Sequence, residues 1–269
     1  MAMIRANGIS LYYEVRGTGP GVVLVHGSWG DADSWERVVP GLAEDCTVVV
    51  YDRRGHSRSE DVLSQGSVYE DAADLAALIE GLRLAPVFVG GTLYGAMVAL
   101  RLASVRPELI RGVAAHEPPA TGLLAADPEL CRLADAALAR VAPVRLLLER
   151  GETAAAAELF VETVTYGPGA WSALPAPLRH TYIRNAPTFL DELRDPDAHD
   201  LDLTALGRFP ETVLLTQSDD SDPLSSAVLD IIDLALPKAE RHLYEGAGRE
   251  PQVVEPSDFV RATAPYALR

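Results

Sequence analysis

Short runs of β-branched and apolar residues, separated by helical patterns, constrain the fold of this chain more than any other feature. Two of these runs, residues 21–25 (GVVLV) and 47–51 (TVVVY), are apolar along almost their whole length. Strands of that kind are buried on both faces, which is typical of a parallel sheet covered by helices. Further strands are expected at residues 11–15, 87–89, 112–115, 212–216 and 241–244. The alternation of strands and helices predicts a doubly wound α/β fold.

Helical patterns divide the chain into a core and an insertion. Ser67 and Glu70 have the spacing of a capping box, so a helix is expected over residues 73–82. From about residue 118 to residue 209 the patterns are helical and rich in alanine. We therefore expect an α/β core of residues 1–117 and 210–269, with a helical cap formed by residues 118–209 between its two parts.

Charge and composition limit the partners of the chain. It has 39 Asp and Glu residues against 23 Lys and Arg residues, a net charge of −16. Nucleic acid and anionic membranes attract basic surfaces, so neither is expected as a partner. Cys46 and Cys131 lack the spacing of a disulfide framework or a metal site, and no nucleotide-binding loop is present, so no cofactor or metal is expected. Without a secretory signal or a long apolar stretch, a cytoplasmic location is predicted.

Four motifs resemble those of the α/β-hydrolase family. They are, in chain order, VLVHGSWGDADSW, YDRRGHSRS, VGGTLYGAMVALRLA and EGAGREPQVVEPSDF. In the family they correspond to the oxyanion loop, the end of the next strand, the nucleophile elbow and the histidine loop. The resemblance covers essentially the whole chain. It implies an α/β-hydrolase fold whose substrate lies between the sheet and the cap.

Two catalytic residues of the family are replaced. Matching the elbow pattern G-x-S-x-G to residues 90–94 puts Thr92 at the serine position and Tyr94 in place of the second glycine. Arg249 stands at the histidine position. A guanidinium stays protonated and cannot take the proton of a hydroxyl group. The resemblance therefore implies that serine-type hydrolysis is lost.

Other parts of the site are expected to remain. The amides of Ser28 and Leu93 are candidate oxyanion donors, which can stabilise an enolate as well as a tetrahedral intermediate. Asp220 or Asp222, after the strand predicted at residues 212–216, is either the family's acid or a solvated loop charge. Two candidate bases follow the strand predicted at residues 112–115, His116 and Glu117. A carboxylate of the substrate is a third possible base.

The substrate is expected to meet Arg249, which would hold a carboxylate, and a set of mostly aromatic side chains. These are Trp29, Tyr94, Trp171, Phe189 and Arg179.

The replacement of both the serine and the histidine is similar to that in atypical members of the family from peptide natural-product biosynthesis, the bottromycin-type peptide epimerases. That similarity implies a cofactor-free isomerase that inverts the Cα of an aspartate in a modified peptide. Two alternatives stay open: a divergent hydrolase that uses Thr92 or a bound water, and a protein that binds a small molecule or peptide without turnover.

Overall fold

The computed structural model describes residues 2–61 and 64–269, and it contains one mixed β-sheet. Its strands are β1 (Ala2–Ala6), β2 (Ile9–Arg16), β3 (Gly21–Val25), β4 (Thr47–Tyr51), β5 (Val87–Thr92), β6 (Ile110–His116), β7 (Val213–Ser218) and β8 (Ala239–Tyr244). They lie in the order β1-β2-β4-β3-β5-β6-β7-β8. The pairings that involve β2 are antiparallel and the remaining pairings are parallel. The predicted, mostly parallel α/β sheet is confirmed, with β1 as an additional edge strand.

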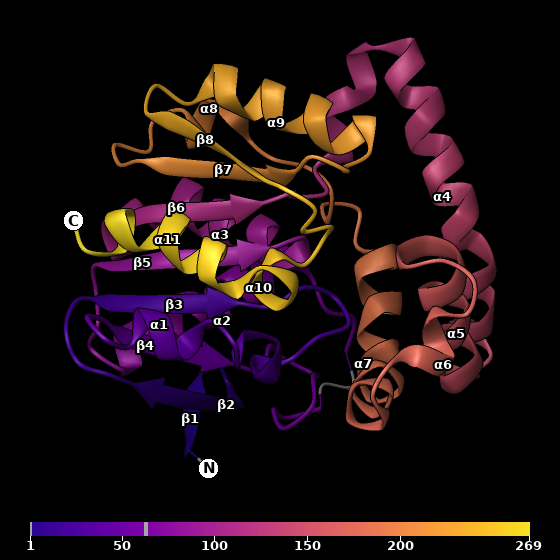
Figure 1. The fold of residues 1–269 in the computed structure, drawn as a ribbon, viewed down its shortest axis with the longest axis horizontal. Helices are drawn as coiled ribbons and strands as arrows, with labels where there is room; N and C mark the ends of the chain where they lie inside the picture. Colours follow the sequence, from indigo (N-terminus) through magenta and orange to yellow (C-terminus); the bar gives the residue numbers. More distant parts are fainter. Residues whose placement is uncertain (1, 62–63) are drawn as a thin grey trace.

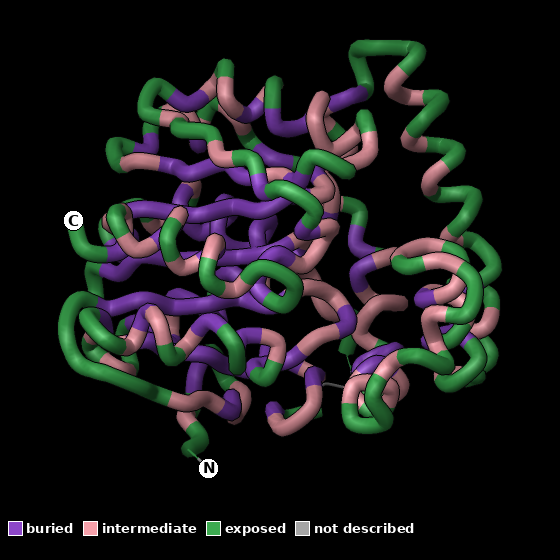
Figure 2. Tube along the Cα trace, viewed as in Figure 1, coloured by how far each residue is buried: buried purple, intermediate pink, exposed green. Residues whose placement is uncertain are grey.

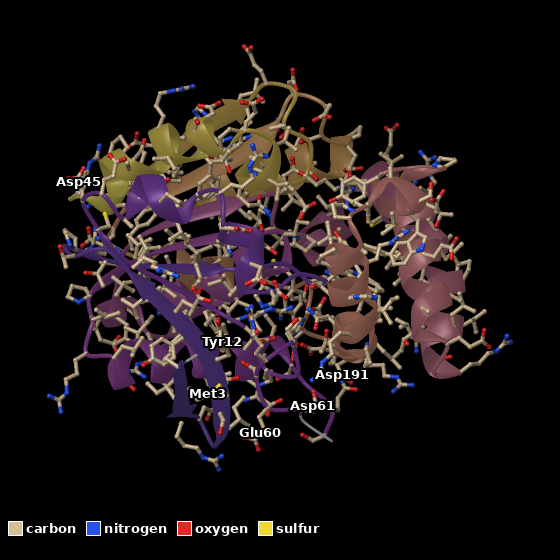
Figure 3. All side chains as sticks on the ribbon, turned by 60° about the horizontal axis from the view of Figure 1, so that its bottom comes forward. Met3, Tyr12, Asp45, Glu60, Asp61 and Asp191 are labelled. Carbon is tan, nitrogen blue, oxygen red and sulfur yellow. The ribbon has the colours of Figure 1, made fainter. Side chains whose placement is uncertain are left out.

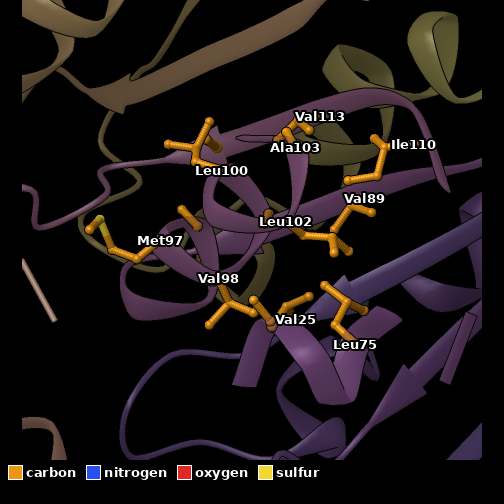
Figure 4. Packing of buried hydrophobic residues seen from close by; sticks show 14 of the residues in the cluster. Val25, Leu75, Val89, Met97, Val98, Leu100, Leu102, Ala103, Ile110 and Val113 are labelled. Carbon is orange, nitrogen blue, oxygen red and sulfur yellow. The ribbon is translucent and has the colours of Figure 1, made fainter. Parts of the chain in front are cut away.

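Helices cover both faces of the sheet (Figure 1). They are α1 (Val39–Leu42), α2 (Val68–Gly81), α3 (Tyr94–Val105), α8 (Leu203–Leu206), α9 (Pro223–Ala235), α10 (Pro251–Val254) and α11 (Pro256–Ala267). Neighbouring residues of β3 pack on opposite faces of the sheet, because successive side chains of a strand point to opposite sides. Val25 packs with α2 and α3, as Figure 4 shows, whereas Leu24 belongs to the cluster that contains Trp35 and Phe259.

Ser67 caps α2, as the capping-box spacing predicts. Its hydroxyl accepts a hydrogen bond from the Glu70 amide at 3.3 Å. The helix begins at Val68, ahead of the predicted residue 73. The difference arises because the apolar periodicity identifies the buried face of a helix, while the cap identifies its first turn.

Four helices between β6 and β7 lie to one side of the sheet, on the right of Figure 1. They are α4 (Pro128–Glu149), α5 (Thr153–Phe160), α6 (Ala170–Ala173) and α7 (Ala176–Arg194), and we call them the helical cap. Their buried residues form a cluster of their own, in which Trp29 is the contribution of the sheet side. Four later residues of the predicted insertion pack in the core of the sheet instead, namely Ala198, Leu201, Leu206 and Phe209.

Burial is uneven in the helical cap. Val144 and Leu148 are the buried residues of α4, and the half of this helix that projects beyond the rest of the molecule is exposed or partly exposed (Figure 2). Within residues 2–61 and 64–269, no helix combines the length and apolar character that a membrane span requires.

Candidate active site

The turn from β5 to α3 has Leu93, not Thr92, at its apex. Leu93 has φ 52° and ψ −119°, a conformation that costs a non-glycine residue about 1–3 kcal/mol. Thr92 is the last residue of β5 and pairs with His116 in the sheet. The register predicted for the elbow is therefore wrong by one residue, and Thr92 does not occupy the nucleophile position.

Two glycines enforce this geometry. A Cβ atom added to Gly91 would lie 2.4 Å from the carbonyl oxygen of Gly95, and one added to Gly95 would lie 2.2 Å from that of Val25. Neither distance leaves room for a side chain, so strand and helix can approach this closely only with glycine at both positions. The pattern G-x-S-x-G thus corresponds to residues 91–95. Leucine stands at the serine position, and its side chain offers no nucleophile.

With the elbow at residues 91–95, one of the two expected oxyanion donors changes. The amide of Leu93 donates to the carbonyl of His116 at 2.8 Å, so it is already occupied. Tyr94 is the first residue of α3, where N–H groups have no partner within the helix. Ser28, Leu93 and Tyr94 line the same cavity. The amides of Ser28 and Tyr94 are therefore the candidate donors, and the helix dipole favours negative charge at the same place.

Arg249 and Asp222, which the sequence motifs match to the family's histidine and acid, form an ion pair. The Nη2 atom of Arg249 lies 2.8 Å from Oδ2 of Asp222. The other carboxylate oxygen accepts hydrogen bonds from the amides of Leu224 and Ser225 at 2.9 and 3.1 Å, and so caps α9. Asp222 lines the cavity that contains Leu93, whereas Asp220 is not among its lining residues. Of the two candidate acids, the structure brings only Asp222 to the site.

Glu117 adds a second carboxylate to this cavity. It follows β6, is 3% exposed and has φ 43°. Its Oε1 atom accepts hydrogen bonds from the amide of Ser218, at 3.1 Å, and from the hydroxyl of Ser221. Burial raises the pKa of Glu117, and these hydrogen bonds oppose the rise without cancelling it. A carboxylate with a raised pKa is a stronger base than an ordinary one.

His116 lies behind the wall of the cavity, with its Nε2 atom 3.7 Å from Oε1 of Glu117. Its side chain is buried in the sheet, and its Nδ1 atom lies 3.0 Å from the hydroxyl of Thr216. Burial lowers the pKa of His116 to about 3, so the ring is neutral. It is not among the residues that line the cavity beside Glu117. His116 therefore does not reach a substrate in the cavity directly, and its role as a base stays a prediction.

The cavity between the sheet and the helical cap has a volume of about 200 Å³. Tyr94 and Phe189 line it, as expected. Trp29 does not: it stacks on Phe160, with ring centroids 4.5 Å apart, and lines a smaller neighbouring cavity. Trp171 and Arg179 line neither cavity. The lining side chains that the sequence did not predict include Phe160, Arg140, Glu192 and His199.

A buried ion network joins the helical cap to the sheet beside this cavity. The Arg53 guanidinium, 1% exposed, lies 3.0 Å from Asp71 of α2 and 2.7 Å from Glu192 of α7. It also lies 4.6 Å from the ring centroid of Tyr94. Arg53 belongs to a family motif, but its partner Glu192 is 139 residues away. No local pattern could have paired them.

On the other side of this network lies a polar cavity of about 270 Å³. Arg53, Tyr94 and Glu192 line it, and Tyr94 and Glu192 also line the candidate site. Asp61 and Asp191, labelled in Figure 3, also line it. In the part of the chain that the structure describes, no group of three or more His, Cys, Asp or Glu side chains is placed to hold a metal ion.

Comparisons with known proteins agree with this architecture. The sequence matches the family described as "Alpha/beta hydrolase family" over residues 22–262. The "Uncharacterized hydrolase YraK" of Bacillus subtilis is 38% identical over 117 residues, which are 43% of this chain and 43% of that protein. The pyrrolizixenacetamide deacetylase of Xenorhabdus hominickii is 34% identical over 114 residues, 42% of this chain and 43% of that protein. The chain thus matches less than half the length of these relatives.

The fold has close counterparts among solved structures. An alpha/beta hydrolase from Sphaerobacter thermophilus superposes with a TM-score of 0.77. The superposition includes 98% of this chain and 99% of that protein. The two sequences are 21% identical. At that identity the likeness concerns the fold alone.

Proposed function

Because the chain belongs to the alpha/beta hydrolase family, we propose that it is an enzyme that uses the family's pocket for proton transfer rather than for hydrolysis. One observation carries the proposal: Leu93, which has no reactive group, has the backbone angles of the elbow apex. Arg249 cannot serve as the base that would activate a nucleophile. Since triad members act as a unit, replacing both removes the route to an acyl-enzyme.

The remaining groups suit removal of a proton from a carbon next to a carbonyl. Glu117 would take the Cα proton on its buried carboxylate. The amides of Ser28 and Tyr94 would stabilise the enolate oxygen that forms. A proton from water then adds to the opposite face of the carbon, and Glu117 releases its proton to water. The product is the epimer, with no net change in atoms.

The substrate that we propose is a modified peptide with an aspartate at the reacting position. Arg249 donates one hydrogen bond to Asp222. Its guanidinium group has further N–H donors that could bind a substrate carboxylate. The side chain of this aspartate is attached to the reacting Cα, so its carboxylate stays close to the proton that is removed. Its own carboxylate is the alternative base to Glu117.

Hydrolysis by a bound water is a second candidate, because two relatives are named a hydrolase and a deacetylase. Glu117 would then take a proton from water instead of from carbon. Thr92 is a weaker candidate nucleophile than a water molecule, since it lies within β5 and not at the apex of the turn.

Incubation of an aspartate-containing modified peptide in deuterated water tests the proposal. We expect deuterium at the aspartate Cα and a mixture of epimers. Because Glu117 must be ionised to act, the exchange rate should rise with pH, with a midpoint above the 4.5 of an ordinary glutamate. Glu117→Gln should slow exchange by about 100-fold or more. Glu245→Gln, at an exposed residue, is the matched control and should leave the rate unchanged.

Each alternative has its own signature in this experiment. Cleavage of the peptide without deuterium at Cα would favour the water-dependent hydrolase. Saturable binding of a peptide that is recovered unchanged would favour a binding protein. Either result would overturn the proton-transfer proposal.

A further inference from the structure

A small cavity adjoins the candidate site beside Leu93. Its volume is about 70 Å³. Four residues line both this cavity and the larger one: Ser28, Leu93, Phe160 and Arg249. Because the amide of Ser28 is one of the two candidate oxyanion donors, a carbonyl group bound to these donors lies where the two cavities meet.

Each of the two cavities contributes one glutamate. Glu117 lines the larger cavity but not the smaller one, and Glu250 lines the smaller cavity but not the larger one. The residues that line both cavities lie between these two glutamates, so the two carboxyl groups approach a bound carbon from different sides. Epimerisation needs such a pair, because the proton leaves one face of the carbon and a proton returns to the other.

The carboxyl group of Glu250 has no role in holding the fold together. Glu250 directly precedes α10, and its side chain is mostly buried. Among the described residues, none donates a hydrogen bond to this carboxyl group, and its oxygen atoms stay accessible. Asp222 differs, because its two oxygens are occupied by Arg249 and by the amides at the start of α9. Glu250 is therefore available to a ligand, whereas Asp222 is not.

Burial also keeps a proton on Glu250. It raises the pKa of Glu250 to about 7, so about half of the molecules carry the neutral acid at pH 7. Arg249, the cation nearest in the chain, is paired with Asp222 at 2.8 Å, which offsets its charge. The other titratable side chains that line the cavities beside Glu250 are Tyr166, Tyr182, Asp220, Asp222 and Arg249.

An outer cavity of about 420 Å³ gives Glu250 access to water. Glu250 lines this outer cavity as well as the small one. The lining of the outer cavity includes the exposed residues Asp220 and Gly246. Glu250 can therefore take a proton from water on one side and present it to the candidate site on the other.

We propose that Glu250 is the acid through which the proton of water reaches the substrate carbon, on the face opposite to Glu117. Glu117 takes the proton as the Cα–H bond breaks, and the electron pair passes to the enolate oxygen. The new C–H bond forms with the proton of Glu250, whose O–H bond breaks. Water then removes the proton of Glu117 and gives one to Glu250, so no atom is gained or lost. The assignment rests on the proton transfer proposed above.

Two epimeric substrates in deuterated water test this role. The peptide of the exchange experiment above is prepared with L-aspartate and, separately, with D-aspartate. In Glu250→Gln the L peptide should still gain deuterium, because Glu117 removes its proton and returns a deuteron to the same face. Its inversion should be slowed by about 100-fold or more. The D peptide, whose proton faces Glu250, should lose both exchange and inversion.

Two further variants separate a catalytic role from a structural one. Glu250→Asp keeps a carboxyl group and should retain part of the inversion, which a change that only disturbs the loop would not restore. Glu245→Gln changes an exposed glutamate of the same loop and should leave exchange and inversion of both peptides unchanged. If Glu250→Gln does not fold, Glu250→Asp still decides, since its inversion should fall more than the exchange of the L peptide.

The results distinguish this inference from the function on which it rests. If the unchanged chain brings no deuterium into either peptide, proton transfer is wrong and the role of Glu250 fails with it. If the unchanged chain inverts both peptides and Glu250→Gln does so equally fast, only the role of Glu250 is wrong. Equal slowing of exchange in the L and D peptides would also overturn it, because one acid on one face must affect the two epimers differently.

Discussion

Leu93 keeps a strained backbone conformation although it presents no reactive group. The strain of about 1–3 kcal/mol is normally associated with exposing a nucleophile. In this chain the same turn places the first N–H groups of α3 at the cavity, among them the amide of Tyr94. The turn can therefore serve oxyanion stabilisation alone, which explains why its geometry persists without a serine.

Restoring the two replaced residues should restore hydrolysis. Asp222 is already in contact with Arg249, so the double variant Leu93→Ser, Arg249→His would complete a serine, histidine and aspartate triad. We expect it to hydrolyse p-nitrophenyl acetate at least about 100-fold faster than the unchanged chain. Leu93→Ser alone lacks a base, and Arg249→His alone lacks a nucleophile, so both single variants should stay inactive. Esterase activity in Leu93→Ser alone, equal to that of the double variant, would contradict this explanation.

The element that builds the site is the unit of β5, the turn and α3. Its close approach to the neighbouring strand depends on Gly95, where an added Cβ atom would meet the carbonyl oxygens of Val25 and His26 at 2.2 and 2.7 Å. His26 in turn is fixed by its Nε2 atom, which accepts from the amide of Arg53 at 2.9 Å. The turn and the oxyanion loop therefore share one set of backbone contacts.

Gly95→Ala should push the turn between β5 and α3 away from the oxyanion loop that follows β3. We expect a loss of about 3 kcal/mol in the free energy of unfolding, measured by urea denaturation, because backbone atoms must move to admit the methyl group. Gly66→Ala is the control, since the nearest atom to its added Cβ is 3.7 Å away, and it should change stability by less than about 0.5 kcal/mol. Equal stability of the two variants would show that the contact at Gly95 is not the constraint.

At the scale of the whole molecule, polar contacts attach the helical cap to the sheet. Arg53 connects the two parts through Asp71 and Glu192. Asn185 of α7 reinforces the contact, because its side-chain amide donates to the carbonyl of Gly30 at 2.7 Å and accepts from the amide of Ser57 at 2.8 Å. The cavity between cap and sheet thus has walls that are fixed by directional bonds.

Removing Arg53 should loosen the cap and destabilise the fold. Arg53→Met leaves two buried carboxylates without their cation, so we expect a loss of about 3–5 kcal/mol. Amide hydrogen exchange should accelerate in α7 before it does in β5 and β6. Arg184→Met removes an exposed arginine of α7 that contacts Asp61 at 3.3 Å, and it should cost less than about 1 kcal/mol. Unchanged exchange in α7 of the Arg53 variant would mean that apolar packing alone holds the cap.

Apolar periodicity and capping residues predict most of the strands and helices along the chain, because these signals act over a few neighbouring positions. The edge strand β1 was not predicted. The EGAGREP motif also predicts that arginine stands where the family has its histidine, since the motif contains one candidate position. The predicted elbow register, residues 90–94, was wrong, because consecutive glycines at 90 and 91 allow two registers. Gly95 was the signal for the correct one.

The correct elbow register and the contacts between distant side chains depend on how the elements pack together. The register follows from backbone clashes at Gly91 and Gly95, which exist only once strand and helix are packed. Arg53 meets Glu192 across 139 residues, and Trp29 and Gln252 line one cavity from opposite ends of the chain. Such contacts arise from the packing of whole elements, and no local pattern in the sequence encodes them.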